Sequence, residues 1–533
     1  MNFKRGATIY LCYLFAFVLL VFVVFYVMYG SVGEKAKTVS GTRMHGITLY
    51  NSKGVIYDRN LCPVAGNQAA YYIIVNPRSF DKTRTEYICD LTKTDTDEFA
   101  SKLNRETPFV LMSYYKPETV VGVSVYEGTT RYAESPSSVH VLGCLDYECI
   151  NGISGVEKSF NEILSKYSSV TKAKYVSDGR RGLLEGLGII IEKDEDSLDG
   201  IVLTIDKRLA DFTKSLMNKY IDRGCVCVMD CNNGEILALE SSPDFEQGNV
   251  KQYLDSKNGE LINLALVNNS VGSVFKMIMA TCALQNNLGE FEYNCTGGID
   301  VGGRIFACHD KNGHGSVGLE KAFATSCNSY FIALGQLLGY EKIIETAQLF
   351  GVDTSMDIIK GMYSESGVLP KNSGIKSLAN LSIGQGDLLL SPLCIARITA
   401  AMCNGGYLVN PVLYKSTYVN GIVKNESEYN YKSNIMDDDI AEKLKAMCIY
   451  CVENGTGKTA SPTYGSAGGK TASAQTGRYD ANGKEQLNTY FTGFYPAESP
   501  KYAITVFAVG GESGSQTCAP VFAEICDFLH QNY

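Results

Sequence analysis

Three short motifs in this chain carry side chains that could together transfer an acyl group through a serine. The first holds Ser273 and Lys276, the second Ser326 and Asn328, and the third begins with Lys470. Ser273 and Lys276 stand three positions apart, which on a helix places both side chains on one face. A serine hydroxyl is a poor nucleophile until a base takes its proton, and Lys276 is the candidate base. The chemistry indicated is nucleophilic attack on a carbonyl.

The remaining polar side chains fit supporting roles in that reaction. Lys276 must be partly desolvated, or lie near another cation, to act as a base near neutral pH, and Lys470 is the candidate cation. Ser326 could relay a proton. Asn328 could orient Lys276 and donate a hydrogen bond to a substrate amide carbonyl. No cofactor is required for this chemistry.

Substrate binding is predicted at the third motif. Lys470 and Thr471 could bind a substrate carboxylate, and the backbone N–H groups of Ser273 and Ser473 are the predicted oxyanion hole. Gly272 fits a tight entry into the helix near Ser273, and the positive end of that helix favours developing negative charge. Alone, each motif has a simpler explanation, such as a helix-capping serine beside a surface lysine. The ordered set of three is much rarer than any one of them.

The third motif has a second copy, because the letters KTAS occur at 458–461 and again at 470–473. We favour the later copy, since residues 474–477 continue it as a strand. The earlier copy lies in the loop-like sequence GTGKT, which also resembles a phosphate-binding loop. Val452 stands where that motif has its first glycine, and no clear strand precedes it, so the sequence gives no support to a nucleotide site.

A candidate metal site lies just ahead of the second motif. Cys295, Cys308 and His314 fall within twenty residues, and two of the chain's five histidines are in this segment. Their spacing is near that of zinc fingers without matching it, and a fourth ligand could come from Asp300 or Asp310. A structural zinc ion, a Cys295–Cys308 disulfide, and free thiols with His314 as a hydrogen-bonding loop residue are three open alternatives.

The elements that must position these motifs follow from hydrophobic patterning. Strand-like runs occur at both ends of the region after residue 199, and apolar helical stretches lie between them. The predicted strands are 201–205, 225–229, 235–239, 490–494 and 502–507. The predicted helices are 274–285, 317–338, 391–403 and 521–529. This order indicates an α+β fold in which helices flank an antiparallel sheet.

The N-terminal segment is predicted to be a membrane anchor. Residues 7–29 carry no charge, and 23 residues suffice to cross a hydrocarbon core of ~30 Å. A cleaved signal peptide has a shorter apolar region. Because Lys4 and Arg5 precede the segment, the positive-inside rule places the N-terminus in the cytoplasm and the rest of the chain outside it.

Composition and charge argue against some classes of protein and indicate the domain boundaries. The net charge of −9 argues against nucleic-acid binding by charge. Of 18 cysteines, Cys12 lies in the anchor, and the odd number left argues against a complete disulfide framework. The charged segment 192–197 reads as a linker. We therefore predict an anchor over 1–29, an elongated domain over 30–198 and a catalytic domain over 199–533.

Beyond the three motifs, the chain resembles class B penicillin-binding proteins over nearly its full length. The sequences GVIYDRN at 54–60 and GVEK at 155–158 are similar to segments that open and close their pedestal domain. Further similar segments are 204–206, 234–238, 242–243, 383–386 and 391–393. The residues of the motifs are most similar to those of the division and sporulation branch of this family. This chain departs from the family pattern at Lys53, Leu61, Val271 and Ala472, and none of these removes a reactive group.

The resemblance implies a penicillin-binding transpeptidase fold and a membrane-anchored peptidoglycan D,D-transpeptidase inhibited by β-lactams. Ser273 would be acylated by a stem peptide, and a membrane glycosyltransferase is the implied partner. Two other functions stay open: a D,D-carboxypeptidase or β-lactam hydrolase, and a non-catalytic scaffold in wall synthesis. The long pedestal disfavours the hydrolase, and the retained reactive residues disfavour the scaffold.

Overall fold

The computed structural model describes residues 3–29, 44–105, 107–177, 183, 188–194, 197–425, 432–480 and 482–533. The chain divides into two compact units. Unit 1 comprises Met1–Ser52, Asn67–Arg131 and Ser168–Ser197, and unit 2 comprises Lys53–Gly66, Tyr132–Tyr167 and Leu198–Tyr533. Parts of the predicted linker at 192–197 and the predicted start of the second domain at residue 30 lie outside the described residues.

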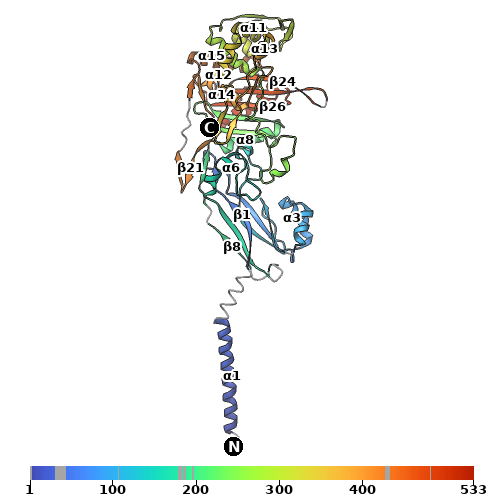
Figure 1. The fold of residues 1–533 in the computed structure, drawn as a ribbon, viewed down its shortest axis with the longest axis vertical. Coiled ribbons are helices and arrows are strands. Elements are labelled where there is room, and N and C mark those ends of the chain that lie inside the picture. The colour runs from blue at the N-terminus through green and yellow to red at the C-terminus, as the bar shows by residue number, and fades with distance from the viewer. Residues whose placement is uncertain are drawn as a thin grey trace. The chain divides into compact units, whose positions relative to one another are not determined.

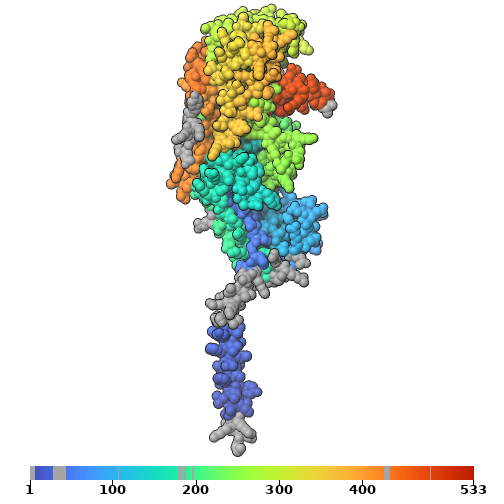
Figure 2. Space-filling model, in the orientation of Figure 1, coloured from blue at the N-terminus to red at the C-terminus, as the bar shows by residue number. Residues whose placement is uncertain are grey.

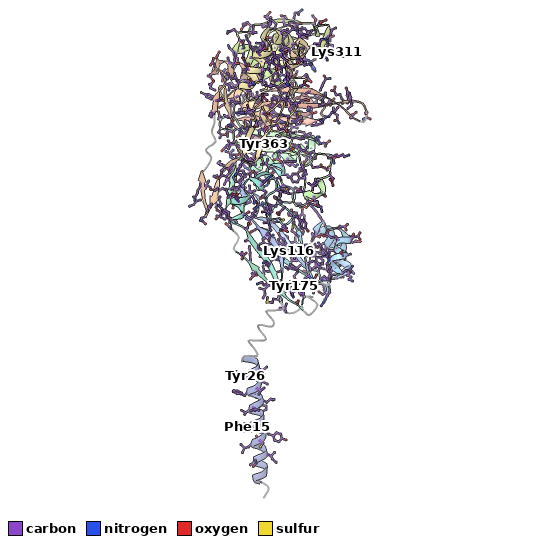
Figure 3. The ribbon with its side chains drawn as sticks, in the orientation of Figure 1. Phe15, Tyr26, Lys116, Tyr175, Lys311 and Tyr363 are labelled. Atoms are coloured by element: carbon purple, nitrogen blue, oxygen red, sulfur yellow. The ribbon has the colours of Figure 1, made fainter. Side chains whose placement is uncertain are left out.

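The apolar N-terminal segment forms a single helix, α1, over Phe3–Tyr29 (Figure 1). Its stretch Gly6–Val27 has a mean hydropathy of 2.7 over 22 residues, which is enough to cross a membrane at ~1.5 Å per residue. Large apolar side chains such as Phe15 and Tyr26 project from it and are exposed (Figure 3). Within the described residues it is the one helix that passes this test, so the structure fits a single-pass membrane anchor.

Unit 1 is built on two three-stranded antiparallel sheets. One has the order β1-β7-β8, from Met44–Ser52, Ser169–Val176 and Ile189–Lys193. The other has the order β5-β4-β6, from Phe109–Ser113, Gln68–Val75 and Val123–Thr130. The rings of Tyr50 on β1 and Tyr72 on β4 stack at 4.8 Å, which joins the two sheets. Two helices, α3 (Thr85–Thr92) and α4 (Thr96–Leu103), complete the unit with the short η1 (Lys82–Arg84).

Unit 2 contains segments that sequence analysis assigned to the elongated domain. Strand β2 (Val55–Tyr57) runs parallel to β9 (Gly200–Leu203), and β3 (Pro63–Ala65) pairs with β2. The resulting sheet has the order β22-β21-β9-β2-β3, with β21 over Tyr414–Val419 and β22 over Ile422–Asn425. Because these backbone hydrogen bonds join residues far apart in the chain, a single boundary at 198/199 does not describe the packing. Three short helices from the same part of the chain also belong to unit 2: α5 (Val139–Leu142), α6 (Gly155–Ser159) and α7 (Asn161–Ser165).

The central sheet of unit 2 is antiparallel and five-stranded, in the order β11-β10-β26-β25-β24. Its strands are β10 (Gly224–Asp230), β11 (Ile236–Ser242), β24 (Gly468–Tyr479), β25 (Glu485–Tyr495) and β26 (Tyr502–Val509). These include four of the strands predicted from hydrophobic runs, and their antiparallel pairing confirms the predicted α+β class. Far from the sheet centre, the β24–β25 hairpin projects from the surface of the unit (Figure 2).

Helices cover both faces of this sheet. Phe491 packs against Phe522 of α16 (Ala519–Asn532), whereas the next residue, Thr492, bonds Thr399 of α14 (Pro392–Cys403) at 2.7 Å. Adjacent residues of a strand point to opposite faces, so α16 and α14 lie on opposite sides. On the α16 side, α8 (Lys207–Tyr220) stacks Phe212 on Phe528. All twelve residues of α14 are buried, as expected for a helix inside the core.

A mainly helical region carries the first two motifs. Its helices are α9 (Lys276–Gln285), α10 (Leu319–Ala324), α11 (Asn328–Leu338), α12 (Tyr340–Leu349), α13 (Ile375–Ser382) and α15 (Asp438–Asn454). The predicted helix 317–338 is therefore two helices, and the break contains the second motif. Small ribbons connect them: β12 (Asn269–Ser270) with β19 (Leu389–Leu390), β13 (Tyr293–Cys295) with β16 (Gly315–Val317), β14 (Gly298–Val301) with β15 (Arg304–Ala307), β17 (Met356–Ile359) with β18 (Met362–Ser364), and β20 (Tyr407–Val409) with β23 (Lys432–Asn434).

Candidate active site

Ser273 lies in a tight 3-10 turn, η3 (Gly272–Phe275), that leads directly into α9. Gly272 has a φ of +64°, and its N–H donates to the carbonyl of Gly384 at 2.8 Å. A Cβ at Gly384, whose φ is +73°, would lie 1.9 Å from the carbonyl oxygen of Gly272. Only glycine allows this approach. The pair fixes the entry of the helix and leaves the side chain of Ser273 half-buried beside it.

Lys276 is the first residue of α9, and its side chain is fully buried. Its Nζ donates to the carbonyl oxygen of Ser326 at 2.8 Å, to the hydroxyl of Ser326 at 3.1 Å and to Oδ1 of Asn328 at 2.7 Å. The predicted contacts between the first and second motifs are therefore present. Since a neutral amine keeps two donors and gains a lone pair, the Ser326 hydroxyl can exchange a proton with it.

The electrostatics around Lys276 favour the neutral amine. Burial, followed by the nearby charge of Lys470, holds the pKa of Lys276 well below its ordinary value. Burial lowers the pKa of Lys470 as well. Each Nζ lies over an aromatic ring, Phe331 at 5.4 Å for Lys276 and Phe323 at 5.7 Å for Lys470. A desolvated lysine beside a second cation is the arrangement that base catalysis near neutral pH needs.

The second motif depends on an unusual backbone conformation. Ser326 has a φ of +55°, in the left-handed region that residues with a Cβ rarely adopt. This conformation, which costs about 1–3 kcal/mol, breaks the chain between α10 and α11. As a result, both the carbonyl and the hydroxyl of Ser326 point at one amine. Asn328 begins α11, and its Nδ2 donates to the carbonyl of Ala307 at 3.3 Å.

The third motif lies on β24, the edge strand of the central sheet. Lys470 is fully buried, and its Nζ donates to the carbonyl of Thr471 at 3.1 Å. A Cβ built on Gly272 would lie 3.1–3.2 Å from atoms of Ala474, so this strand passes directly beside the turn that holds Ser273. The hydroxyl of Ser473 accepts from the N–H of Gly514 at 3.1 Å. Ala472 is 3% exposed, so its methyl group is buried and does not face an open cleft.

The earlier KTAS copy forms a short 3-10 turn, η4 (Lys458–Ala460), rather than a strand. Lys458 and Thr459 are exposed, and the Thr459 hydroxyl donates to the carbonyl of Ser515 in η5 (Gly514–Cys518). The copy on β24 is the one placed beside Ser273.

Four ligating side chains meet next to the second motif. Ligand atoms of Cys295, Cys308, His314 and Cys327 all lie within 4.8 Å of one another. The Sγ of Cys308 is 3.5 Å from Nδ1 of His314 and 3.7 Å from Sγ of Cys327. Hydrogen bonding by Cys327 lowers the pKa of Cys308 to about 3. Cys295 and Cys308 are both free thiols.

The carboxylates of Asp300 and Asp310, the candidate fourth ligands, accept hydrogen bonds within their own loops. Oδ1 of Asp300 accepts from the N–H of Gly303, and Oδ1 of Asp310 accepts from the N–H of Asn312, each at 2.9 Å. Cys327, the middle residue of the second motif, takes the fourth place in the cluster. The sequence did not single out Cys327, because it lies between Ser326 and Asn328 and outside the segment 295–314.

A family model described as the penicillin binding protein transpeptidase domain matches residues 224–527. The chain belongs to this family. The peptidoglycan D,D-transpeptidase MrdA of Acinetobacter baumannii is 28% identical over 88% of this chain and 80% of its own length. The stage V sporulation protein D of Bacillus subtilis is 27% identical over 87% of this chain and 75% of its own length. The fold is similar to that of penicillin-binding protein PBP2 from Helicobacter pylori, with a TM-score of 0.66 and 21% identity over 91% of this chain and 99% of that one.

These relatives make this chain a class B penicillin-binding protein and an enzyme of the serine transpeptidase class. Two of the positions at which the sequence departs from the family pattern are buried. Val271 is fully buried and directly precedes the glycine turn. Lys53 is buried and donates to Oδ1 of Asn161 at 2.6 Å, which ties β2 to the helices of unit 2.

Proposed function

We propose that this penicillin-binding protein is a peptidoglycan D,D-transpeptidase that cross-links stem peptides through an acyl-enzyme on Ser273. The observation that carries the proposal is the buried Lys276 amine, which bonds the second motif and lies one turn from Ser273. The matched family and the named activity of the bacterial relatives support the substrate class. The relatives at 28% and 27% identity are named as a D,D-transpeptidase and as a sporulation protein.

The reaction has two acyl transfers. In the first, the Ser273 hydroxyl gives its proton to neutral Lys276 while its Oγ bonds the carbonyl carbon of the penultimate D-alanine. The C–N bond then breaks, and the departing D-alanine takes a proton relayed through the Lys276–Ser326 pair. In the second, an amine on a neighbouring stem peptide loses a proton to the same base and attacks the ester. Ser273 is thereby regenerated, and a new peptide bond is formed.

The edge strand β24 supports a binding mode for the donor peptide. An extended peptide can add to an exposed sheet edge through backbone hydrogen bonds. Along β24 such a peptide would place its reacting carbonyl near the backbone N–H groups of Ser273 and Ser473, the proposed oxyanion hole. Its terminal carboxylate would then reach Thr471 and the positive charge of Lys470.

Labelling of the full-length protein in detergent with a fluorescent penicillin tests this function. We expect a covalent adduct that forms within minutes and persists for hours, because a transpeptidase excludes water from its acyl-enzyme. An adduct that forms and disappears quickly would instead establish the hydrolase alternative. Absence of any adduct on folded protein would favour a scaffold.

We further propose the orientation and a partner of the anchor. With Lys4 and Arg5 at its start, α1 places the N-terminus in the cytoplasm and the catalytic unit outside, where peptidoglycan is built. A membrane-embedded glycosyltransferase that supplies nascent strands is the partner proposed for the anchor and unit 1. The product of this glycosyltransferase is the glycan strand whose stem peptides Ser273 would cross-link.

We propose a structural zinc ion at the four-residue cluster. Three thiolates and an imidazole are a common structural zinc set. With Zn–S of ~2.3 Å and Zn–N of ~2.0 Å, tetrahedral geometry requires S···S of ~3.8 Å and S···N of ~3.5 Å. The Cys308–Cys327 and Cys308–His314 distances of 3.7 and 3.5 Å fit these values. Such an ion would hold Cys327, and with it the strained Ser326 and Asn328, against Lys276.

Metal removal is expected to slow penicillin acylation and to lower the melting temperature. Metal analysis of the full-length protein should give one zinc per chain, and Cys327→Ser should reduce it to below half. Cys526→Ala, a buried cysteine outside the cluster, is the matched control and should keep its zinc. Zinc-free protein in which peptide mass analysis finds a Cys295–Cys308 cross-link would contradict the proposal and establish the disulfide.

A further inference from the structure

The loop-like GTG sequence at 455–457 forms a tight turn at the end of α15 that contacts Ala324, just ahead of the second motif, and Thr471 of the third motif. The N–H groups of Gly455 and Gly457 donate to the carbonyl of Cys451 at 3.0 and 3.1 Å. Between them, the N–H of Thr456 donates to the carbonyl of Ala324, two residues before Ser326, at 3.0 Å. A Cβ at Gly455 would lie 2.3 Å from that carbonyl oxygen, so a larger residue would displace the turn.

The side chain of Thr456 reaches from this turn to the third motif. Its Oγ1 lies 2.6 Å from Oγ1 of Thr471. The other oxygen acceptor of its hydroxyl is the carbonyl of Ala324 at 3.4 Å, which is longer than a usual O–H···O bond. The short hydroxyl pair is therefore the main bond of the Thr456 side chain.

The direction of this bond decides what Thr471 can do. A hydroxyl has one proton, so within the pair one threonine donates and the other accepts. If Thr456 donates, the proton of Thr471 stays free to bond an anion. If Thr471 donates, its oxygen lone pairs face the substrate and repel a carboxylate. Thr471, which is itself 7% exposed, shares a strand face with the exposed Ser473.

We propose that Thr456 is a positioning residue for carboxylate recognition: its hydroxyl donates to Thr471 and so aims the Thr471 proton at the carboxylate of the donor peptide or a β-lactam. This inference rests on the proposed function, in which Thr471 binds that carboxylate. An arriving carboxylate, which can only accept, selects the same direction of the bond. Thr456 also bonds Ala324, two residues before Ser326.

The test is the rate constant for acylation by benzylpenicillin, measured with full-length protein in detergent. Thr456→Val keeps the shape of the side chain and removes the hydroxyl, and we expect its rate to fall about tenfold, the value of one hydrogen bond to a charged group. Thr456→Ser should stay within about twofold of wild type. Thr459→Val is the matched control, since the Thr459 hydroxyl bonds Ser515 and not the third motif, and its rate should be unchanged.

A second substrate separates positioning from general damage to the site. With the methyl ester of benzylpenicillin, which has no carboxylate, Thr456→Val and wild type should react at the same rate. In a Thr471→Val background, Thr456→Val should cause no further loss with the free acid. An equal loss on acid and ester, or no loss on either, overturns the proposal, and Thr456→Ala repeats the test if the valine variant does not fold. A wild-type protein that is not acylated at all would instead overturn the proposed function.

Discussion

Ser273→Ala is expected to abolish both penicillin labelling and peptide cross-linking. The substitution removes the only atom that the proposed mechanism bonds to the substrate, and loss of a catalytic serine costs about 10⁶-fold in comparable hydrolases. Ser273 is half-buried in a turn fixed by backbone contacts between Gly272 and Gly384, so the fold should not depend on its hydroxyl. Label is read on a gel, and cross-linked product by mass spectrometry.

The repeated KTAS sequence supplies a matched control for this experiment. Ser461→Ala changes an exposed serine at the end of η4, in the earlier copy, and should leave labelling intact. Equal melting temperatures of Ser273→Ala and wild type would exclude misfolding as the cause of any loss. Undiminished labelling of Ser273→Ala would show that another residue is acylated and would remove the basis of the proposed mechanism.

The sequence indicated side chains that the structure brings together, because the pattern of each motif is local in the chain. Ser273 and Lys276 share one turn of chain, and Ser326 and Asn328 flank a single residue. The contact between these pairs was expected from the roles of Ser326 as a proton relay and of Asn328 in orienting Lys276. What the sequence did not predict is the means of that contact. The left-handed backbone at Ser326 splits the expected helix 317–338, and nothing in its residue type requires that conformation.

The residues that sequence analysis missed act across long distances in the chain. Cys327 joins the metal cluster through a turn between two helices, and Thr456 meets Thr471 from the end of a separate helix. Both residues lie in sequence patterns that have another interpretation. The cysteine was the variable position of a motif, and the GTG turn was dismissed together with the nucleotide-binding loop that it resembles. A residue's partner in a folded chain is set by packing, which neither pattern reveals.

The division of the chain into units also depends on packing that sequence patterns do not reveal. The charged segment before residue 198 suggested one boundary, and the anchor was clear from its length and lack of charge. The pairing of β2 with β9 could not be inferred, because a three-residue strand carries no periodicity of its own. Segments assigned to the elongated domain therefore pack with the catalytic unit.

Lys276→Met should reduce penicillin acylation by about 10²–10⁴-fold, the usual contribution of a general base. Methionine has a similar length, but it leaves the carbonyl of Ser326 and Oδ1 of Asn328 without their donor, so we also expect a lower melting temperature. Lys458→Met, which changes the exposed lysine of the earlier KTAS copy, is the matched control and should retain full activity. A loss of less than about threefold in Lys276→Met would assign the base to another group.

The direction in which the acylation rate changes with pH also tests whether Lys276 is the base. Lys276 acts as a base only when neutral, so the rate should rise as the pH increases through its pKa. Burial and then the charge of Lys470 hold that pKa well below 10.5, which places the rising limb on the acid side of that value. Lys470→Met removes a neighbouring positive charge, so the pKa of Lys276 should rise and the increase in rate should occur at higher pH.

The measurement is the acylation rate constant across the pH range in which the protein stays folded. A limb that stays in place in Lys470→Met, or moves to lower pH, would contradict the paired-lysine arrangement, because removing a neighbouring positive charge can only raise the pKa of an amine.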